Sequence, residues 1–392
     1  MDSQVTAARE MMRALVSFDT TSDRSNLDLI SFVERYLDGF GVSYQRIPSP
    51  DGAFANLFAT LGPKDTSGIA LSGHTDCVPV TGQAWSTDPF ELTERDGKLY
   101  GRGSCDMKGF IAIALSMIPK WASLDLKTPI HFALSYDEEV GCTGVGHMIE
   151  RIGADLPAPK AVIVGEPTMM RVVDAHKGGA HFRTVLTGRA SHSARDDLGV
   201  NTVFAAGNVL AKLDEIRARL VTDGDPSGRF TPPYSSLHVG KITGGTAVNI
   251  VPSRTEIDWE IRPLPDVDAL EVKAELDAWV NAELVPEMRK HAEEAGIETE
   301  MLTVVPAFAG RAESEAGQMA LRCAQRNATE TVAYITEACL FQEAGHETIV
   351  CGPGDIEQAH KPDEFIALSQ VEAAIAFMER LGTACSEETK AG

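Results

Sequence analysis

Histidine and acidic side chains recur in this sequence where short apolar segments end or glycine-rich turns begin. Imidazole nitrogens and carboxylate oxygens are common protein ligands of zinc and related divalent ions. Two such ions held close together polarise an acyl group and activate water at neutral pH. The pattern therefore indicates a hydrolytic centre with two divalent cations, and its candidate ligands are His74, Asp106, Glu139, Glu166 and His360.

His74 and Asp76 belong to the segment LSGHTDCVPV and lie two residues apart on a predicted strand. Side chains at this spacing leave the same face of a strand. A metal-bound imidazole usually donates its second N–H to a carboxylate, which fixes the tautomer of the ring. Asp76 is therefore expected to orient His74, although a hydrogen-bonded structural pair without a metal explains the same motif.

Asp106 lies in YGRGSCDMKGF, where glycines flank it and a helix is predicted to follow. Small neighbours let the backbone approach an ion closely, and sites of this kind form at the edge of an α/β sheet. Two alternatives remain open. Asp106 caps the helix N-terminus, or Cys105 supplies a soft thiolate ligand, which oxygen-rich surroundings disfavour.

Glu138 and Glu139 end an apolar strand pattern in ALSYDEEVGCTGV. Successive strand residues point to opposite faces, so the two glutamates are expected to have different roles. One can bind a cation while the other faces the substrate as a base. The alternative is that both are solvated turn residues.

Alternating strand and helix patterns surround these residues. The sequence predicts strands at 68–80, 130–134 and 161–164, with helices at 27–40 and 107–121. Such alternation favours an α/β fold with a mainly parallel sheet covered by helices on both faces. The pattern resumes after Gly310 and ends in a helix predicted at 362–381.

The middle of the chain has a different order of elements. Its predicted order βαββαβ is that of a ferredoxin-like two-layer domain inserted into the α/β domain. The predicted parts are 1–177 and 309–392, which together form the catalytic domain, and 178–308, which forms the insertion. The elements of the insertion are expected at 181–186, 201–220, 236–242, 254–261, 267–294 and 298–305.

The formal net charge of -22 argues against nucleic acid and anionic membrane surfaces as partners. The N-terminal segment mixes charged and apolar residues and does not predict a signal peptide, and no apolar run approaches the length of a membrane span. The seven cysteines are scattered, without a CxxC pair. This usage predicts a protein of the reducing cytoplasm.

The segments HTD, GRGSCDMKG, DEE, GEPT and AHKPDE resemble, in this order, the motifs of the M20 family of metallopeptidases and deacylases. The resemblance runs from about Arg13 to the C-terminal helix and covers both domains. The longer segments WSTDPFELTERDGKLYGRG and GPGDIEQAHKPDEF are more specific. They are similar to the branch of the family that deacetylates N2-acetyl-L-ornithine.

This resemblance implies a role for each candidate residue. His74, Asp106 and Glu166 would hold one cation, and Asp106 would bridge to a second, held also by Glu139 and His360. Glu138 would be the general base, and Asp76 would support His74. The family resemblance also implies that the inserted domain is a lid that dimerises.

Four further residues are implied only by the resemblance. His192, in GRASHSARDD, would hydrogen-bond the substrate oxygen, often from the partner subunit. Asn249 and Arg262 would bind the substrate carboxylate, a role that suits a bidentate guanidinium. The alternative for Arg262 is an ion pair with Asp258 or Glu260. Glu337, in YITEACLF, would line the substrate pocket. Because the side-chain ammonium of ornithine needs an acceptor when it leaves water, Glu337 is also the candidate for that role.

The expected reaction is hydrolysis of N2-acetyl-L-ornithine to acetate and L-ornithine, a step of arginine biosynthesis, with Zn²⁺ or Co²⁺. Alternative substrates are succinyl-diaminopimelate, another N-acyl amino acid or a dipeptide. An amino-acid-binding protein with a structural metal would need a closed four-ligand site and no spare base. A two-metal phosphoesterase would need cationic groups for phosphate, which the charge of -22 fits poorly.

Overall fold

The computed structural model describes residues 2–387. The chain forms two compact units: Met1–Asp174, Ala309–Glu330 and Thr336–Gly392 make the first, and Ala175–Phe308 and Thr331–Ile335 make the second. The sequence predicts boundaries after residues 177 and 308, whereas the structure divides after Asp174 and Phe308. Among the described residues, no helix combines the length and apolarity that a membrane crossing requires.

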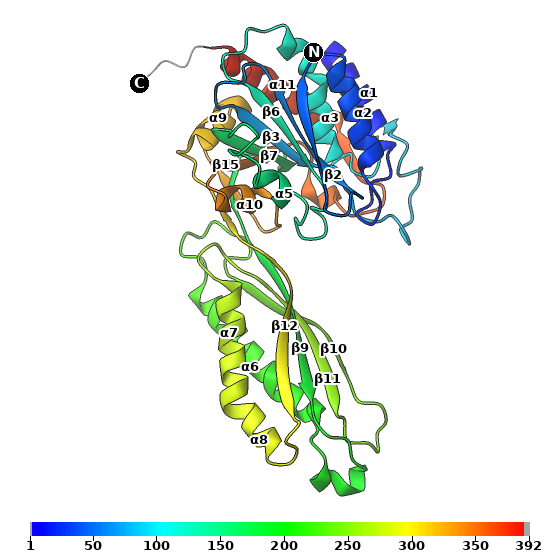
Figure 1. The fold of residues 1–392 in the computed structure, drawn as a ribbon, viewed down its shortest axis with the longest axis vertical. Helices are drawn as coiled ribbons and strands as arrows, with labels where there is room; N and C mark the ends of the chain where they lie inside the picture. Colours follow the sequence, from blue (N-terminus) through cyan, green and yellow to red (C-terminus); the bar gives the residue numbers. More distant parts are fainter. Residues whose placement is uncertain (1, 388–392) are drawn as a thin grey trace. The chain divides into compact units, whose positions relative to one another are not determined.

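The first unit is built on a sheet whose four central strands run parallel, with antiparallel strands at its edges. This confirms the predicted mainly parallel α/β fold, and Figure 1 shows helices on both faces of the sheet. The strands follow the order β1 (Ser43–Pro48), β2 (Ala55–Leu61), β6 (Ile130–Ser135), β3 (Ile69–His74), β7 (Ala161–Pro167), β15 (Thr348–Gly352), β8 (Val173–His176) and β13 (Phe308–Ala309), and β14 (Glu330–Val332) pairs with β8.

Every residue of β2, β3, β6, β7 and β15 is buried, as expected for apolar strands covered on both faces. The strand predicted at 68–80 is shorter, because β3 ends at His74. The register pairs His74 with Ser135 and Gly352 with Pro167. The carboxyl ends of the parallel strands therefore meet at one edge of the sheet.

The helices of the first unit are α1 (Asp2–Val16), α2 (Leu27–Asp38), α3 (Lys108–Ser116), α4 (Ile118–Ala122), α5 (Gly146–Ile149), α9 (Glu315–Ala324), α10 (Ala338–Glu343) and α11 (Leu368–Ser386). All nine residues of α3 are buried. A Cβ at Gly165 would lie 2.2 Å from the ring of Phe110, so glycine lets α3 lie directly on β7. This contact sits one residue before Glu166.

Two predicted helices of the first unit are corrected by the structure. The helix predicted at 107–121 is interrupted at Met117, just before Pro119, and divides into α3 and α4. The C-terminal helix begins at Leu368 rather than at residue 362, because Phe365–Ala367 forms strand β16. β16 pairs with β5 (Lys98–Tyr100), which pairs with β4 (Thr93–Arg95), in a small antiparallel sheet.

The second unit follows the predicted order βαββαβ, with an antiparallel sheet in the order β10-β11-β9-β12. The helix predicted at 267–294 is divided by a π-helical stretch before Pro286 and ends at Arg289. The elements are β9 (Gly179–Thr187), η1 (Ser193–Leu198), α6 (Thr202–Asp223), β10 (Ser236–Gly244), β11 (Arg254–Arg262), α7 (Ala269–Trp279), η2 (Val280–Leu284), α8 (Val285–Arg289) and β12 (Gly296–Val305).

Candidate metal centre

The five predicted ligands gather at the carboxyl edge of the parallel sheet. His74 ends β3 and Glu166 lies near the end of β7. Glu139 follows β6, and His360 follows β15 after the short helix η3 (Ile356–Gln358). Asp106 lies in the turn before α3. The sheet therefore positions side chains that come from five separate parts of the sequence.

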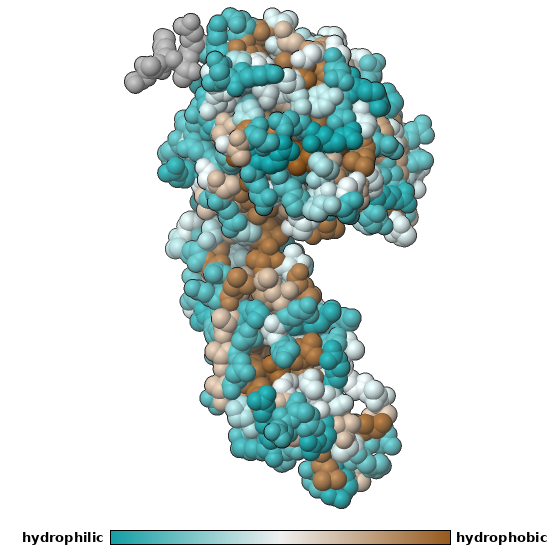
Figure 2. Space-filling model, in the orientation of Figure 1, coloured by the Kyte–Doolittle hydropathy of each residue, from teal (hydrophilic) through white to brown (hydrophobic). Residues whose placement is uncertain are grey.

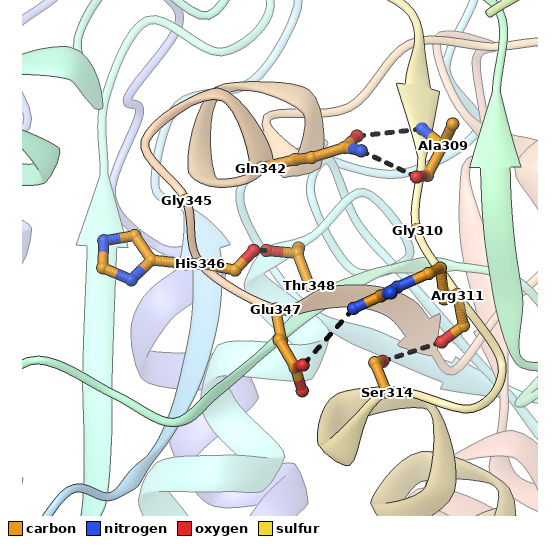
Figure 3. Close-up of a pocket in the computed structure, with 9 residues that line it drawn as sticks. All are labelled: Ala309, Gly310, Arg311, Ser314, Gln342, Gly345, His346, Glu347 and Thr348. Atoms are coloured by element: carbon orange, nitrogen blue, oxygen red, sulfur yellow. Dashed lines mark hydrogen bonds and ion pairs between the residues drawn. The ribbon is translucent and has the colours of Figure 1, made fainter.

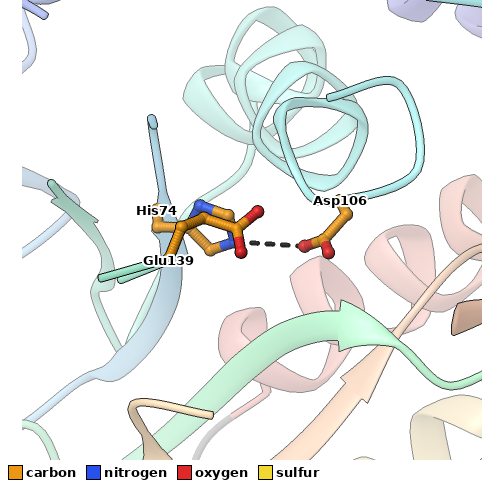
Figure 4. A group of neighbouring side chains, drawn as sticks. All are labelled: His74, Asp106 and Glu139. Atoms are coloured by element: carbon orange, nitrogen blue, oxygen red, sulfur yellow. Dashed lines mark hydrogen bonds and ion pairs between the residues drawn. The ribbon is translucent and has the colours of Figure 1, made fainter. Parts of the chain in front are cut away.

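The carboxylate of Asp106 lies between two histidines. Its Oδ1 is 3.1 Å from His74 Nε2, and its Oδ2 is 3.4 Å from His360 Nε2. Figure 4 shows the side chains of Asp106, His74 and Glu139 converging. One oxygen thus faces each histidine, which is the arrangement that a carboxylate bridging two cations requires.

Each histidine also has a glutamate of its own. Glu139 Oε2 is 3.0 Å from His360 Nε2, and Glu166 Oε1 is 3.7 Å from His74 Nε2. Ligand atoms within 4.8 Å of one another also form the groups His74, Asp106 and Glu139, and His74, Glu138 and Glu166. His74 belongs to both groups, so the groups do not separate two cation positions. The distances do: Glu166 lies near His74, and Glu139 lies near His360.

The donors fit divalent cations. The Oε1 atoms of Glu139 and Glu166 are buried without a hydrogen-bond partner. Burial raises the pKa of both carboxyls, because it removes water from their charged form. Buried carboxylates of this kind are costly unless a positive charge compensates them. Two cations among these oxygens would supply that charge.

The carboxylates of the cluster also raise the pKa values of the two histidines. Hydrogen bonds with Asp106 and Glu139 raise the pKa of His360 to about 10. Burial lowers the pKa of His74, but Asp106, Asp76 and Glu166 raise it well above its usual value. These carboxylates favour positive charge at both imidazoles. A metal ion can provide that charge while the imidazoles stay neutral as ligands.

Asp76 lies beyond the end of β3, so the predicted position on the strand with His74 is wrong. The Nδ1–H of His74 donates to the Asp76 backbone carbonyl at 3.0 Å, and an Asp76 carboxylate oxygen lies 3.4 Å from Nδ1. The carboxylate instead accepts the backbone N–H groups of Glu138 and Glu139, both at 3.2 Å. Asp76 thus links His74 to the two glutamates.

The predicted strand alternation of Glu138 and Glu139 is also wrong. β6 ends at Ser135, and Asp137 has a φ of 57°, so both glutamates lie in a turn. Glu139 reaches His360, whereas Glu138 groups with His74 and Glu166. Burial raises the pKa of Glu138 well above its usual value. A carboxylate with a raised pKa beside the ligands is suited to take up a proton.

Two alternatives for the Asp106 segment are excluded. Met107, not Asp106, is the N-cap residue of α3, and it makes no side-chain cap hydrogen bond. The Cys105 thiol donates to the Asp355 carbonyl at 3.3 Å, and burial raises the pKa of this thiol well above its usual value. The thiol is directed at a carbonyl and belongs to neither group of converging ligand atoms among the described residues, so it is not placed as a ligand.

His192, Asn249 and Arg262 belong to the second unit, so their predicted contacts with substrate at the cluster stay predictions. His192 and Asn249 are exposed and lie on neighbouring segments, because the Ser193 N–H donates to the Asn249 carbonyl at 3.0 Å. Arg262 ends β11 and lies 3.3 Å from Glu260. The ion pair considered for Arg262 in the sequence is therefore present, with Glu260.

Glu337 is fully buried. Its two oxygens accept hydrogen bonds from the hydroxyls of Ser72, at 2.6 Å, and Ser135, at 2.7 Å. Both serines lie on strands that lead to the cluster. This placement favours bracing of β3 against β6, and the substrate contact predicted for Glu337 would require these hydrogen bonds to break.

Sequence reasoning missed Glu364 and Arg102. Their side chains form a fully buried ion pair with 2.7 Å between Nη1 and Oε2. Glu364 also accepts the backbone N–H of Asp106 at 3.1 Å. Its place in AHKPDE, four residues after His360, was the available signal, but a charge in a turn ordinarily indicates solvent exposure.

A cavity of about 320 Å³ elsewhere in the first unit contains none of the predicted site residues. Its lining includes Arg311 and Glu347, which lie 3.8 Å apart (Figure 3). The Gln342 side chain is also engaged, by the backbone of Ala309. Because Arg311, Glu347 and Gln342 already have partners, this cavity offers no convergent set of charged groups for chemistry.

The model of peptidase family M20/M25/M40 matches residues 70–383. The chain belongs to this family. An acetylornithine deacetylase of Myxococcus xanthus is 36% identical over 391 residues, which cover 97% of this chain and 98% of that protein. The M20 chain described here is therefore a metal-dependent hydrolase and is similar to acetylornithine deacetylases.

Solved structures of low sequence identity share the fold of this M20 chain. The aminopeptidase PepT of Bacillus cereus superposes with a TM-score of 0.76 at 17% identity, covering 98% of this chain and 99% of that one. A dinuclear metal-binding M20 peptidase of Bacillus subtilis has a TM-score of 0.66 at 15% identity, covering 98% and 99%. At these identities the likeness concerns the fold.

Proposed function

We propose that this M20 hydrolase converts N2-acetyl-L-ornithine to L-ornithine and acetate, with two divalent cations at the Asp106 cluster. The observation that carries this proposal is the Asp106 carboxylate, whose oxygens face His74 and His360. The name of the Myxococcus xanthus relative supports the substrate. The dinuclear metal binding named for the Bacillus subtilis structure supports the number of cations.

Zn²⁺ is the proposed cation, and the same histidine and carboxylate ligands can also bind Co²⁺. His74, Asp106 and Glu166 would hold one ion, and Asp106, Glu139 and His360 the other. Bound cations of this kind polarise an acyl carbonyl and lower the pKa of water to about 7.

Glu138 is the proposed general base. It would accept a proton from the attacking water and pass it to the departing amine. Burial raises its pKa well above that of a solvated glutamate, which strengthens it as a base. Asp76 supports this role, because its carboxylate holds the backbone N–H of Glu138 at 3.2 Å.

His192 is proposed to donate a hydrogen bond to the oxyanion that forms on the acyl carbon. Its Nδ1 accepts the N–H of Ala194 at 3.1 Å, so the proton of a neutral ring resides on Nε2. That leaves Nε2 as the donor. Arg262 and Asn249 are proposed to bind the α-carboxylate, and for this Arg262 would exchange Glu260 for the substrate.

The second unit is proposed to form a homodimer. Apolar side chains are exposed on α6, at the end of β10 and in the loop that follows, and Figure 2 shows apolar surface on this unit. Phe204 is 77% exposed and Val248 is fully exposed. Exposed apolar side chains that form a contiguous patch mark protein contact surfaces. A second copy of the chain is the proposed occupant.

A reducing cytoplasm is the proposed compartment. All seven cysteines are free and buried. Thiols that stay unpaired inside a protein are typical of a reducing environment.

The proposal is tested with a panel of N-acyl amino acids and dipeptides against Zn²⁺-loaded and Co²⁺-loaded enzyme. We expect the highest kcat/KM for N2-acetyl-L-ornithine, loss of activity on exhaustive chelation, and recovery on adding back divalent metal. Full activity after chelation would refute the metal-dependent mechanism. A wide preference for N-acetylmethionine, succinyl-diaminopimelate or a dipeptide would leave the hydrolase in place and remove the ornithine assignment.

A further inference from the structure

Glu364 ties the segment that carries His360 to the loop that carries Asp106. Its Oε1 accepts the backbone N–H groups of Cys105, at 2.8 Å, and Asp106, at 3.1 Å. Its Oε2 accepts the N–H of Gly103, at 3.2 Å, and Nη1 of Arg102, at 2.7 Å. One buried carboxylate therefore takes four hydrogen bonds, three of them from the backbone of the Asp106 loop.

Gln83 completes the network on the side of His360. Its Oε1 accepts Nη2 of Arg102 at 2.7 Å and the indole N–H of Trp85 at 3.0 Å. Its Nε2 donates to the His360 carbonyl at 3.0 Å. The arginine that holds Glu364 thus also holds the side chain that restrains His360.

The backbone of His360 needs such restraint. Its φ is 63°, in the left-handed region that residues other than glycine seldom adopt. Strained conformations of this kind persist only where the surroundings over-determine them. The next acidic residue along, Asp363, accepts the backbone N–H of Ser86 at 2.8 Å and adds a second tie to the same neighbouring loop.

We propose that Glu364 is a positioning residue of the metal centre, which fixes the spacing between Asp106 and His360 through the loop amides, Arg102 and Gln83. This inference rests on the proposed two-cation function. His74 and Glu166 lie on strands, where ladder hydrogen bonds set their positions. Asp106 and His360 lie in turns, where no ladder does so.

The role differs from general stabilisation. A buried ion pair adds little to stability compared with apolar residues of the same size, because both charges lose their hydration. Removing the acceptor oxygens, by contrast, frees the amides that set the Asp106 backbone. The effect of Glu364 should therefore appear in metal affinity more than in the melting temperature.

The experiment compares two double variants, Arg102→Met/Glu364→Gln and Arg102→Met/Glu364→Met. Both remove the ion pair and leave no unpaired buried charge. Only the Glu364→Gln side chain keeps an oxygen that can accept hydrogen bonds from the backbone N–H groups of Cys105 and Asp106. Zn²⁺ affinity is measured by competition with a chromophoric chelator, the visible spectrum of the Co²⁺-loaded protein reports ligand geometry, and the melting temperature is measured without metal.

We compare the affinity for the more weakly bound of the two Zn²⁺ ions. The double variant with Glu364→Met should bind this ion about 10–100-fold less tightly than the double variant with Glu364→Gln, which is the usual loss when a group that orients a ligand is removed. Its Co²⁺ spectrum should change as well. Trp121→Phe is the control for destabilisation, because it removes a buried hydrogen bond to the Met378 carbonyl in which no ligand takes part. It should lower the melting temperature and leave Zn²⁺ affinity unchanged.

Equal Zn²⁺ affinities and identical Co²⁺ spectra in the two double variants would overturn the inference. If the Glu364→Met protein does not fold, Gln83→Met provides the test, since it releases the His360 carbonyl and keeps Glu364. Unchanged affinity in that variant would also overturn it. Wild-type protein that binds only one ion would refute the two-cation function itself, so the two failures are distinguishable.

Discussion

The two units of the chain carry their candidate functional side chains in opposite ways. In the first unit His74, Asp106 and Glu166 are buried and face one another. In the second unit His192 and Asn249 are exposed at the surface. The fold alone sets the geometry of the first group, whereas the second group, in the proposed function, would acquire its partners on binding. Substitutions of the buried metal ligands in the first unit should therefore alter metal content, and those in the second unit should alter turnover.

The largest expected effect is that of Asp106→Ala. This carboxylate is shared by both halves of the cluster, so its loss should abolish tight binding at both sites and remove activity. Elemental analysis of the metal-loaded protein should fall from about two ions per chain toward none. Retention of two tightly bound ions would show that Asp106 does not bridge.

Glu138→Gln should cut turnover by about 10²–10⁴, the range for a lost general base, while metal content stays nearly intact. The matched variant Glu139→Gln should instead lower metal occupancy, because Glu139 lies 3.0 Å from His360. Turnover and metal content are measured on the same preparations. An exchange of the two phenotypes would reverse the roles assigned to these neighbouring residues.

His192→Ala tests the second unit. We expect kcat to fall by about 10²–10³, as for loss of one oxyanion donor, with metal content unchanged. Any loss of metal would break the contrast between the units. The matched comparison is Glu138→Gln, which also leaves the metals in place.

Mixing His192→Ala subunits with Glu138→Gln subunits tests whether His192 acts on the site of its own chain or on that of a partner subunit. If the histidine acts on the site of a partner subunit, each heterodimer should contain one working site, and activity should return. Both parent variants must first be shown to be inactive, and heterodimers must be isolated. Absence of recovery in those heterodimers would favour a histidine that acts within its own chain.

The sequence predicts most of the fold and of the cluster for a physical reason. β3, β6 and β7 are short apolar runs bounded by turns, and a parallel sheet brings their ends to one edge. His74 and Glu166 could be predicted because they end such runs. Asp76 and Glu138 do not lie on strands as predicted, because β3 ends at His74 and β6 ends at Ser135, before either residue.

Glu364 could not be found by periodicity. Its partner, the amide of Asp106, lies 258 positions earlier in the chain. Hydrogen bonds from a side chain to a distant backbone leave no local pattern in the sequence. The substrate contacts proposed for His192, Asn249 and Arg262 are also beyond sequence patterning, since they would depend on substrate or on a second chain.

The smallest expected effect is that of substituting Glu337. This residue lies in the first unit, so it tests whether a buried side chain there is positioned by the fold or acquires its partner on binding. Its carboxylate is buried, and both oxygens accept serine hydroxyls. Burial raises its pKa, so the residue gains little from carrying a charge in this position. An ammonium acceptor would instead need an open carboxylate, and losing a desolvated charge partner typically costs about 2–5 kcal/mol.

Glu337→Gln separates these two roles. If Glu337 braces β3 and β6, kcat/KM should fall by a similar factor for N2-acetylornithine and for N-acetylmethionine, which lacks the ammonium, and the melting temperature should fall. If Glu337 receives the ammonium, only the ornithine substrate should suffer, by about 30-fold or more. The geometry leads us to expect the first result. A selective loss at unchanged stability would mean that the serine hydrogen bonds open when substrate binds, and it would place this buried carboxylate with the groups that acquire their partners on binding.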